Sequence, residues 1–116
     1  MPRKSVFEME AGRVYEALVT KAERKGRTRA EVDEVTRWLL GYAPDTLAKA
    51  LAPGQTYGTF LEGAPDPNPK AELITGTICG VRVESIEDPL TRRMRQLDKL
   101  VDELARGKAM EKVLRT

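Results

Sequence analysis

The sequence predicts a mainly helical fold, a small orthogonal bundle of five to six helices, and three observations support this prediction. Apolar residues recur three and four positions apart in the strongest segments, which is the spacing of one helix face. A capping box marks one helix start, and proline after an N-cap residue marks two more. Glycine follows three segments, where helices commonly end in a left-handed residue. The start signals are Thr28–Glu31, Pro69 and Pro89, and the end signals are Gly26, Gly41 and Gly107.

Length and composition predict one domain over residues 1–116. The chain has 116 residues, of which 41% are hydrophobic and 33% charged, a balance typical of globular domains. It contains no internal repeat or linker, and the Pro-rich stretch 63–69 is interpreted as a loop within the domain. No apolar run approaches the ~18 residues of a membrane span, and the N-terminus lacks a secretory apolar segment. We therefore expect a cytoplasmic protein that has no membrane partner.

The first two helices are predicted from apolar stripes that are separated by a glycine-containing turn. The first stripe consists of Ala11, Val14, Tyr15, Leu18 and Ala22. The second stripe follows the capping box and consists of Val32, Val35, Trp38 and Leu39. Two helices joined by so short a turn form a helical hairpin or a crossed pair.

The middle of the chain is predicted to form shorter elements. Asp45 is expected to cap one short helix and Thr56 another, and a further helix is expected over about 69–79. The secondary structure of residues 81–84 is left undecided, because the β-branched residues there also suit a short strand. In that case a two-stranded ribbon would pair Ser5–Phe7 with Val81–Val83.

The longest helix is predicted to begin after Asp88 and to end at Gly107. Its apolar stripe is Leu90, Met94, Leu97, Leu100, Val101 and Leu104. Asp102 stands four residues before Arg106, the acid-first order that favours an ion pair on a helix. A last short helix is expected to bury Met110, Val113 and Leu114.

The lack of histidine and the single cysteine limit the chemistry that the chain can perform. The chain has no histidine and one cysteine, Cys79, so Ser-His-Asp and Cys-His mechanisms are excluded. A zinc site would need carboxylates almost alone, which is unusual. Cys79 lies among apolar residues and is interpreted as a small buried side chain. We expect no metal and no cofactor.

Three blocks of sequence, taken together and in order, carry a resemblance to a known family. They are KAERKGRT (21–28) with EVD (31–33) and WLLGY (38–42); LITG (73–76) with ICGVRVE (78–84); and IEDPL (86–90) running into LDKLVDEL (97–104). The chain resembles the bacterial family known as domain of unknown function 2200, over almost its whole length. The resemblance implies a compact, mainly helical domain. It implies no activity and supplies no catalytic residues.

The first candidate site is a basic turn between the first two helices. The five cations there are Lys21, Arg24, Lys25, Arg27 and Arg29, with Glu23 among them. Lysine and arginine at a helix end can contact phosphates, as in helix-turn-helix proteins. Against this, the second helix begins with acidic residues that would repel a phosphate backbone. A solvated turn is the simpler interpretation.

The second candidate site is a cluster of charged residues near the start of the long helix, at Arg82, Glu84, Glu87 and Asp88. Paired carboxylates can perform general acid–base chemistry when one of them is desolvated. The simpler interpretation is that Asp88 caps the long helix, while Glu84 and Glu87 pair with Arg82 or face solvent.

Charge is unevenly distributed along the chain. Residues 1–30 carry eight basic and four acidic groups, residues 31–91 four and ten, and residues 92–116 eight and four, so both ends are basic and the middle is acidic. The leading hypothesis is a non-enzymatic helical binding module for an unknown protein partner, or one that self-associates. The alternatives are a nucleic-acid-binding protein that uses the 21–29 turn and the basic termini, and a small carboxylate enzyme around Arg82, Glu84 and Glu87.

Overall fold

The computed structural model describes residues 6–78 and 80–114, which contain six α-helices and one two-stranded sheet. The α-helices are α1 (Ala11–Glu23), α2 (Arg29–Leu40), α3 (Pro44–Ala50), α4 (Tyr57–Glu62), α5 (Pro89–Ala105) and α6 (Met110–Val113). The 3₁₀ turns are η1 (Val6–Glu8), η2 (Pro69–Leu73) and η3 (Val83–Ser85), and the strands are β1 (Thr77–Ile78) and β2 (Val81–Arg82). The prediction of a mainly helical fold is confirmed.

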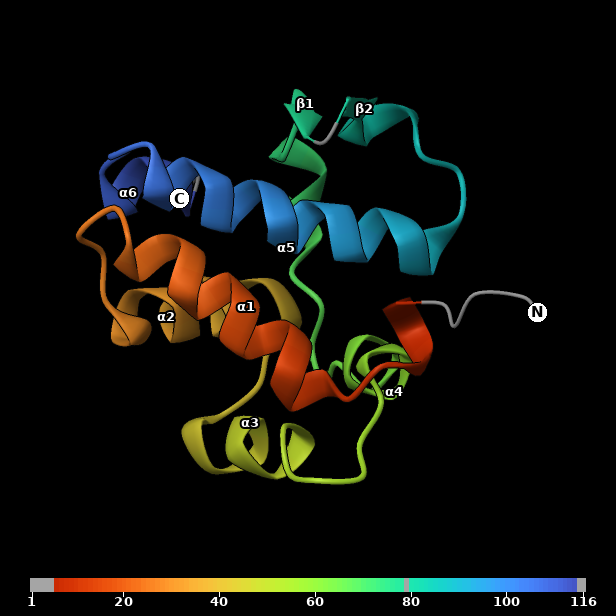
Figure 1. Ribbon diagram of the computed structural model, residues 1–116. Helices are drawn as coiled ribbons and strands as arrows, with labels where there is room; N and C mark the ends of the chain where they lie inside the picture. Colours follow the sequence, from red (N-terminus) through yellow and green to blue (C-terminus); the bar gives the residue numbers. More distant parts are fainter. Residues whose placement is uncertain (1–5, 79, 115–116) are drawn as a thin grey trace.

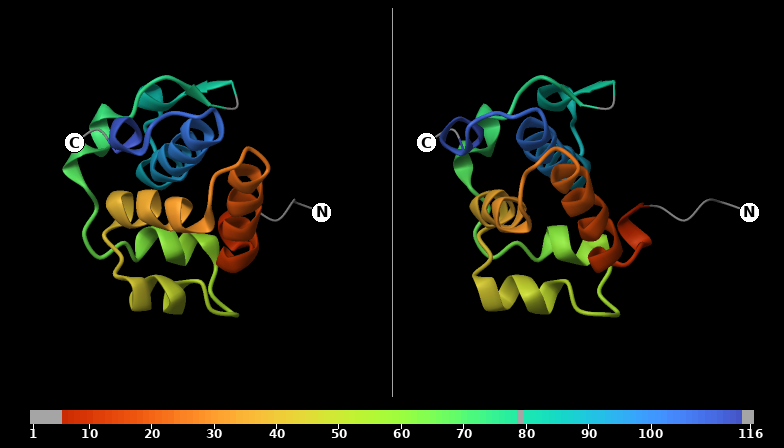
Figure 2. Two further views of the ribbon diagram at one scale, coloured as in Figure 1. Left: turned by 90° about the vertical axis from the view of Figure 1, so that its left-hand side faces the viewer. Right: turned by 60° about the vertical axis from the view of Figure 1, so that its left-hand side comes forward.

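The helices pack around one hydrophobic core. In Figures 1 and 2, α5 lies across the top of α1 and α2, while α4 lies below them and α3 is farthest from α5. Helix α5 is the longest element and contacts α1, α2, α4 and α6. Its predicted apolar stripe is buried at Met94, Leu97, Leu100, Val101 and Leu104, whereas Leu90 is only partly buried. Within the described residues, no helix is both long and apolar enough to cross a membrane.

Helix α1 buries a slightly different face from the predicted one. The buried residues are Ala11, Tyr15, Val19 and Ala22, whereas Val14 and Leu18 are only partly covered. The predicted and the observed apolar stripes share residues, so the sequence spacing is compatible with burial of either face. The contacts of α1 with α2, α4 and α5 decide which of them is covered.

The signals that mark helix ends act as predicted. The Thr28 side chain accepts from the Glu31 N–H (3.2 Å), and the Glu31 carboxylate accepts from the Thr28 N–H (2.9 Å). Asp88 accepts from the Thr91 N–H at the start of α5 (2.9 Å). Gly26, Gly41 and Gly107 all have positive φ. One cap differs, because α3 begins at Pro44 with Ala43 as the N-cap, which places Asp45 inside the first turn.

The predicted ribbon between Ser5–Phe7 and Val81–Val83 is wrong. Val81 pairs with Ile78, and Arg82 with Thr77, in a local antiparallel hairpin. Gly80, at φ +77°, takes the left-handed conformation that its tight turn needs. Residues 6–8 instead form the turn η1, which packs on α4. Ser5 and Cys79 lie outside the described residues.

The helix predicted over 69–79 is also wrong beyond its first turn. Asn68 does cap it, accepting from the Lys70 N–H at 2.9 Å, but the turn is of the 3₁₀ type and ends at Leu73. Gly76 follows at φ +106°, a conformation that an α-helix does not contain. The β-branched residues after it pair in the hairpin, where they fit better than in a helix.

Candidate functional site

The cations of the basic turn do not form one free cluster, because three of them form ion pairs with acidic residues in different parts of the molecule. Lys21 Nζ lies 3.2 Å from an Asp102 carboxylate oxygen on α5. Arg27 contacts Glu31 (2.7 Å), and Arg29 contacts Glu16 (2.6 Å). Each of these three cations therefore already has a counter-ion.

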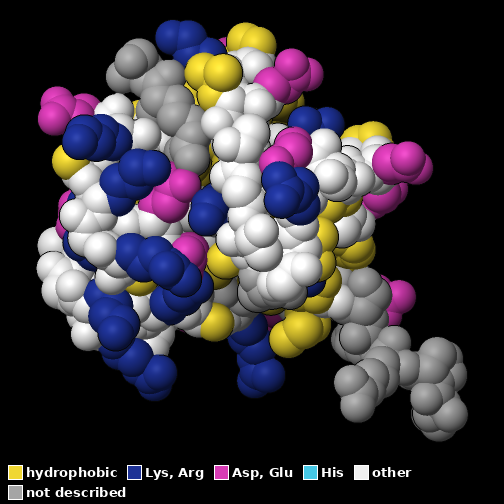
Figure 3. Space-filling view, turned by 90° about the horizontal axis from the view of Figure 1, so that it is seen from above, with side chains coloured by type: hydrophobic (Ala, Val, Ile, Leu, Met, Phe, Trp, Pro, Cys, Tyr) yellow, Lys and Arg dark blue, Asp and Glu magenta, His cyan; other side chains and the backbone are white. Residues whose placement is uncertain are grey.

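Two contacts join the end of α1 to the end of α5. The first is the ion pair of Lys21 with Asp102, and in the second the Arg27 guanidinium donates to the Lys108 carbonyl (3.0 Å). Asp102 also binds Arg106 (2.8 Å) at the end of α5. Segments 81 residues apart thus meet on one surface. We call the resulting cluster the basic end, and its members are Lys21, Arg24, Lys25, Arg106 and Lys108. In Figure 3, dark-blue lysine and arginine side chains gather on the left-hand side, over the ends of α1 and α5.

Among the residues that the structure describes, Arg24 and Lys25 are the two cations of the basic end that have no ion-pair partner. Both are exposed, and within the described part of the chain neither forms an ion pair. Lys108 lies 3.7 Å from Glu103, a longer and weaker pair. Arg24 and Lys25 are therefore the residues of this surface best placed to meet an incoming anion.

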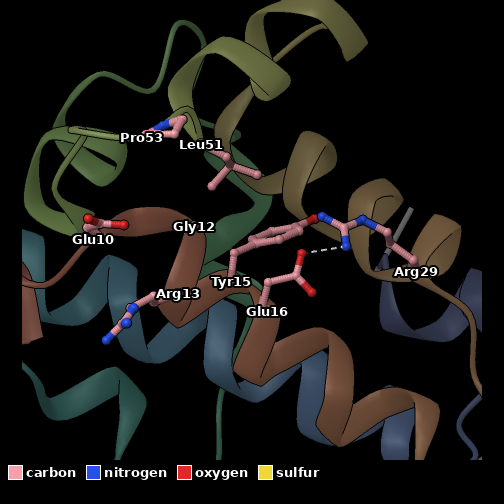
Figure 4. A pocket seen from close by; sticks show the side chains of 8 residues that line it. All are labelled: Glu10, Gly12, Arg13, Tyr15, Glu16, Arg29, Leu51 and Pro53. Carbon is pink, nitrogen blue, oxygen red and sulfur yellow. Dashed lines mark hydrogen bonds and ion pairs between the residues drawn. The ribbon is translucent and has the colours of Figure 1, made fainter.

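Arg29 faces a different part of the molecule. It leaves the turn to lie over the Tyr15 ring, with its guanidinium carbon 5.8 Å from the ring centroid, at the edge of a hollow of about 400 Å³ (Figure 4). The Arg13 side chain points away from the centre of the hollow. The lining residues are Glu10, Gly12, Arg13, Tyr15, Glu16, Arg29, Leu51 and Pro53. Sequence reasoning grouped Arg29 with the turn, and the fold separates it from there.

Tyr15, at the base of this hollow, is held as a neutral phenol. Its hydroxyl donates to the Asp33 carboxylate, and its side chain is buried. Burial, together with the hydrogen bond to Asp33, raises the pKa of Tyr15 far above its usual value. Proton exchange by this phenol is therefore disfavoured, and its contribution is structural.

Arg82, Glu84 and Glu87 lie on the hairpin and the connection to α5. Glu84 accepts from the Gly76 N–H (3.0 Å) and lies 3.4 Å from Arg82. Its own backbone N–H and that of Gly76 hold the pKa of Glu84 below the usual value, so it stays ionised. Glu87 is exposed. The structure thus gives Glu84 a role in bracing the hairpin, and it does not place Glu84 and Glu87 in a shared desolvated pair.

Comparison with known proteins gives the same assignment as the sequence blocks. The model of the family described as "Uncharacterized protein conserved in bacteria (DUF2200)" matches residues 5–115. The chain belongs to the DUF2200 family. It is also similar to the crystal structure of uncharacterized protein SP1917, with 45% identity and a TM-score of 0.90 over 98% of this chain and 95% of that one. No curated protein matches the chain.

The DUF2200 domain holds Asp102 as a buried carboxylate between two cations at the basic end. Burial by itself would raise the pKa of Asp102, but Lys21 and Arg106 outweigh it and hold the pKa below the usual value. Folding therefore weakens proton binding at Asp102. The stability it contributes is present above the unfolded-state pKa of about 3.9 and is lost as pH falls through the lower folded-state pKa.

We expect Asp102→Asn to lower the free energy of unfolding at neutral pH by only about 1–2 kcal/mol, because Lys21 and Arg106 are exposed and solvent screens their charges. The variant should also lose less stability than the parent between about pH 5 and pH 2. Urea denaturation at a series of pH values measures both effects. Asp66→Asn, at an exposed loop position, is the control and should behave like the parent. If the Asp102 variant loses as much stability as the parent between about pH 5 and pH 2, Asp102 does not contribute the ion-paired carboxylate described above.

The sequence indicates the contribution of α5 to this DUF2200 surface only in part. The two basic ends of the chain are visible in the charge pattern, but the contact of Lys21 with Asp102 and the place of Lys108 are not. The signal available was the +4 charge of residues 92–116, which matches that of residues 1–30. Within the described ranges, no group of three or more Cys, Asp or Glu residues is arranged to hold a metal ion.

Proposed function

We propose that this protein is a non-enzymatic binding module that contacts an acidic protein partner through its basic end. The observation that carries the proposal is the joining of the α1 and α5 ends through Asp102 and Arg27, at a turn on which Arg24 and Lys25 are exposed. Positive surface potential at such a patch attracts and orients an acidic surface. We further propose that the module acts in the cytoplasm.

The mixed charge of this end favours a protein over a nucleic acid. Glu23 is exposed among the cations, and Asp102 neutralises part of the charge of Lys21 and Arg106. Nucleic-acid-binding surfaces commonly meet about 6–10 phosphates with lysine and arginine. A patch with two cations that are unpaired among the described residues, together with two more that share one carboxylate, suits a short acidic protein segment better.

A different protein is also a better partner than a second copy bound through the same surface. A two-fold dimer brings the same patch of each subunit face to face. Here that contact would oppose Arg24 and Lys25 to their own copies, and like charges brought together across an interface are unfavourable. The lack of histidine and the structural use of Glu84 also support binding rather than catalysis.

The test is binding of an oligoglutamate peptide and of a duplex DNA fragment, each followed by fluorescence anisotropy at low and at physiological salt. We expect the peptide to bind more tightly in low salt, because exposed charges are screened in high salt. The double variant Arg24→Gln/Lys25→Gln should weaken peptide binding about three- to tenfold, since each exposed pair contributes about 0.2–1 kcal/mol.

The control for this test is Lys49→Gln/Lys70→Gln, which removes the same charge from exposed positions on α3 and η2. Its affinity for the peptide should stay close to that of the parent. Equal losses in both double variants would show a net-charge effect and overturn the assignment of the surface. Failure of the peptide to bind at low salt would overturn the proposal itself, and tighter binding of DNA would replace it with the nucleic-acid alternative.

A further inference from the structure

A second hollow, of about 380 Å³, lies between α5 and the segment that follows α4. Its lining residues are Leu39, Pro67, Asn68, Pro69, Ala71, Glu72, Arg93 and Gln96. The size falls within the range of small-ligand sites, about 300–1,000 Å³. None of these residues belongs to the basic end, so the hollow is independent of the function proposed above.

The wall opposite α5 is fixed to the end of α2. The Asp66 and Asn68 N–H groups donate to the carbonyls of Leu40 (3.2 Å) and Leu39 (3.0 Å). The Asn68 side-chain amide donates to the Trp38 carbonyl (3.2 Å). Figure 2 shows this segment, in green, running along one side of the molecule from α4 past α2. The hollow is therefore built into the fold.

Arg93 is the charged group that stands out in this hollow. It is partly buried, and Nη1 donates to the Leu61 carbonyl (2.7 Å), which positions the guanidinium. Among the described residues it forms no ion pair, nor does its neighbour Arg92, which does not line the hollow; the partly buried Arg27 and Arg95, by contrast, are paired with Glu31 (2.7 Å) and Asp98 (3.2 Å). A partly desolvated cation without a counter-ion is costly, and an anionic ligand would relieve that cost.

Gln96 supplies a second donor on the same face of α5. It is three residues after Arg93, a spacing that brings side chains together on a helix. It is 7% exposed, and its amide nitrogen donates to the Ala71 carbonyl (3.3 Å), which uses one of its two N–H groups. The rest of the wall is largely apolar, from Leu39, Pro67, Pro69 and Ala71.

We propose that this hollow binds a small monocarboxylate with an apolar body. Arg93 holds the carboxylate through its unused N–H groups, a geometry that the planar guanidinium favours. Gln96 donates a further hydrogen bond, and the proline and leucine side chains cover the apolar part.

The acidic residues nearby select for a single negative charge. Glu72 lines the same hollow. Glu62 and Asp88 line a neighbouring hollow that Arg93 also borders, although neither forms an ion pair with it, and Asp88 already accepts from Thr91. Inorganic phosphate, which carries more than one charge near neutral pH, should therefore bind more weakly than a monocarboxylate.

The test is titration of the full chain with isovalerate, and separately with inorganic phosphate, followed by NMR. In the parent protein, isovalerate should shift the side-chain signals of Arg93 and Gln96. Arg93→Met keeps most of the side-chain length and should weaken isovalerate binding at least about tenfold, because a charged hydrogen bond is lost. Arg13→Met is the control, since Arg13 lines the other hollow and likewise forms no ion pair among the described residues; it should bind isovalerate like the parent.

Three results would overturn the proposal: no shift at Arg93 and Gln96 in the parent, equal weakening in both methionine variants, or phosphate binding as tight as that of isovalerate. If Arg93→Met fails to fold, Arg93→Lys replaces it. Lysine keeps the charge but not the planar pair of donors, so its affinity should fall between those of the parent and a variant without the cation. The shifts in the parent protein test the site whether or not a variant folds.

Discussion

Replacing Phe60 by alanine is expected to lower the free energy of unfolding by about 3–5 kcal/mol, the range for deleting a buried aromatic side chain. Phe60 is 1% exposed and lies at the centre of an aromatic cluster. Its ring stacks on Tyr42 (centroids 5.3 Å apart) and on Tyr57 (5.8 Å), and it meets Tyr15 at a steep angle (6.2 Å). Alanine would remove these contacts and leave a cavity.

Urea denaturation of the Phe60→Ala variant measures this effect. Phe60→Leu should cost less, because leucine fills much of the volume and forfeits chiefly the aromatic pairs, each worth about 0.5–1.5 kcal/mol. Leu73→Ala is the control at an apolar residue that is 56% exposed, and its effect should stay within about 0.5 kcal/mol. A loss below about 2 kcal/mol for Phe60→Ala would show that the core rearranges to close the cavity.

The second large effect is expected at Gly41, where alanine should cost about 2–5 kcal/mol. Gly41 has φ +82°, and a left-handed conformation costs a residue with a Cβ about 1–2 kcal/mol. A Cβ there would also lie 2.5 Å from the Asp66 carbonyl oxygen and 2.7 Å from the Asp66 nitrogen. The backbone at Asp66 would have to move, and overpacking of this kind costs about 1–3 kcal/mol more.

Gly26 provides a matched control for this substitution. Its φ of +84° is nearly the same, but a Cβ built at this position would meet no atom within 4 Å apart from its own chain neighbours. Gly26→Ala should therefore show only the conformational cost, about 1–2 kcal/mol. The difference between the two variants in urea denaturation measures the close approach of Asp66. Equal losses would mean that the 65–68 segment moves freely away from α2.

The close approach of Asp66 to Gly41 also affects the proposed carboxylate site. Asp66 and Asn68 attach one wall of that hollow to the end of α2, directly beside Gly41. Gly41→Ala should disturb isovalerate binding as well as stability. Gly26→Ala, in the turn that precedes the opposite end of α2, should leave that binding unchanged.

The candidate surfaces could be predicted only in part. The cations of the 21–29 turn are visible in the sequence, but the fold separates them. Arg29 lies at the Tyr15 hollow, Lys21 is bound to Asp102 on α5, and Arg27 is bound to Glu31. The pairing of Asp102 with Arg106 follows from local helix spacing and was predicted. The contact of Lys21 with Asp102 joins residues 81 positions apart, and no local pattern indicates it. Arg93 carries no distinguishing signal in the sequence, because its lack of a counter-ion is a property of the folded molecule.

The sequence by itself determined the helical class and most helix ends, because caps, proline starts and glycine stops act through neighbouring backbone groups. Thr28 with Glu31, Asp88 with Thr91, and Gly41 all behave as their local chemistry predicts. Tertiary structure alone decided the pairing of Val81 with Ile78, the buried face of α1 and the meeting of the α1 and α5 ends. Short β-branched segments and overlapping apolar stripes admit several arrangements of similar local energy, and only packing against the rest of the chain selects one of them.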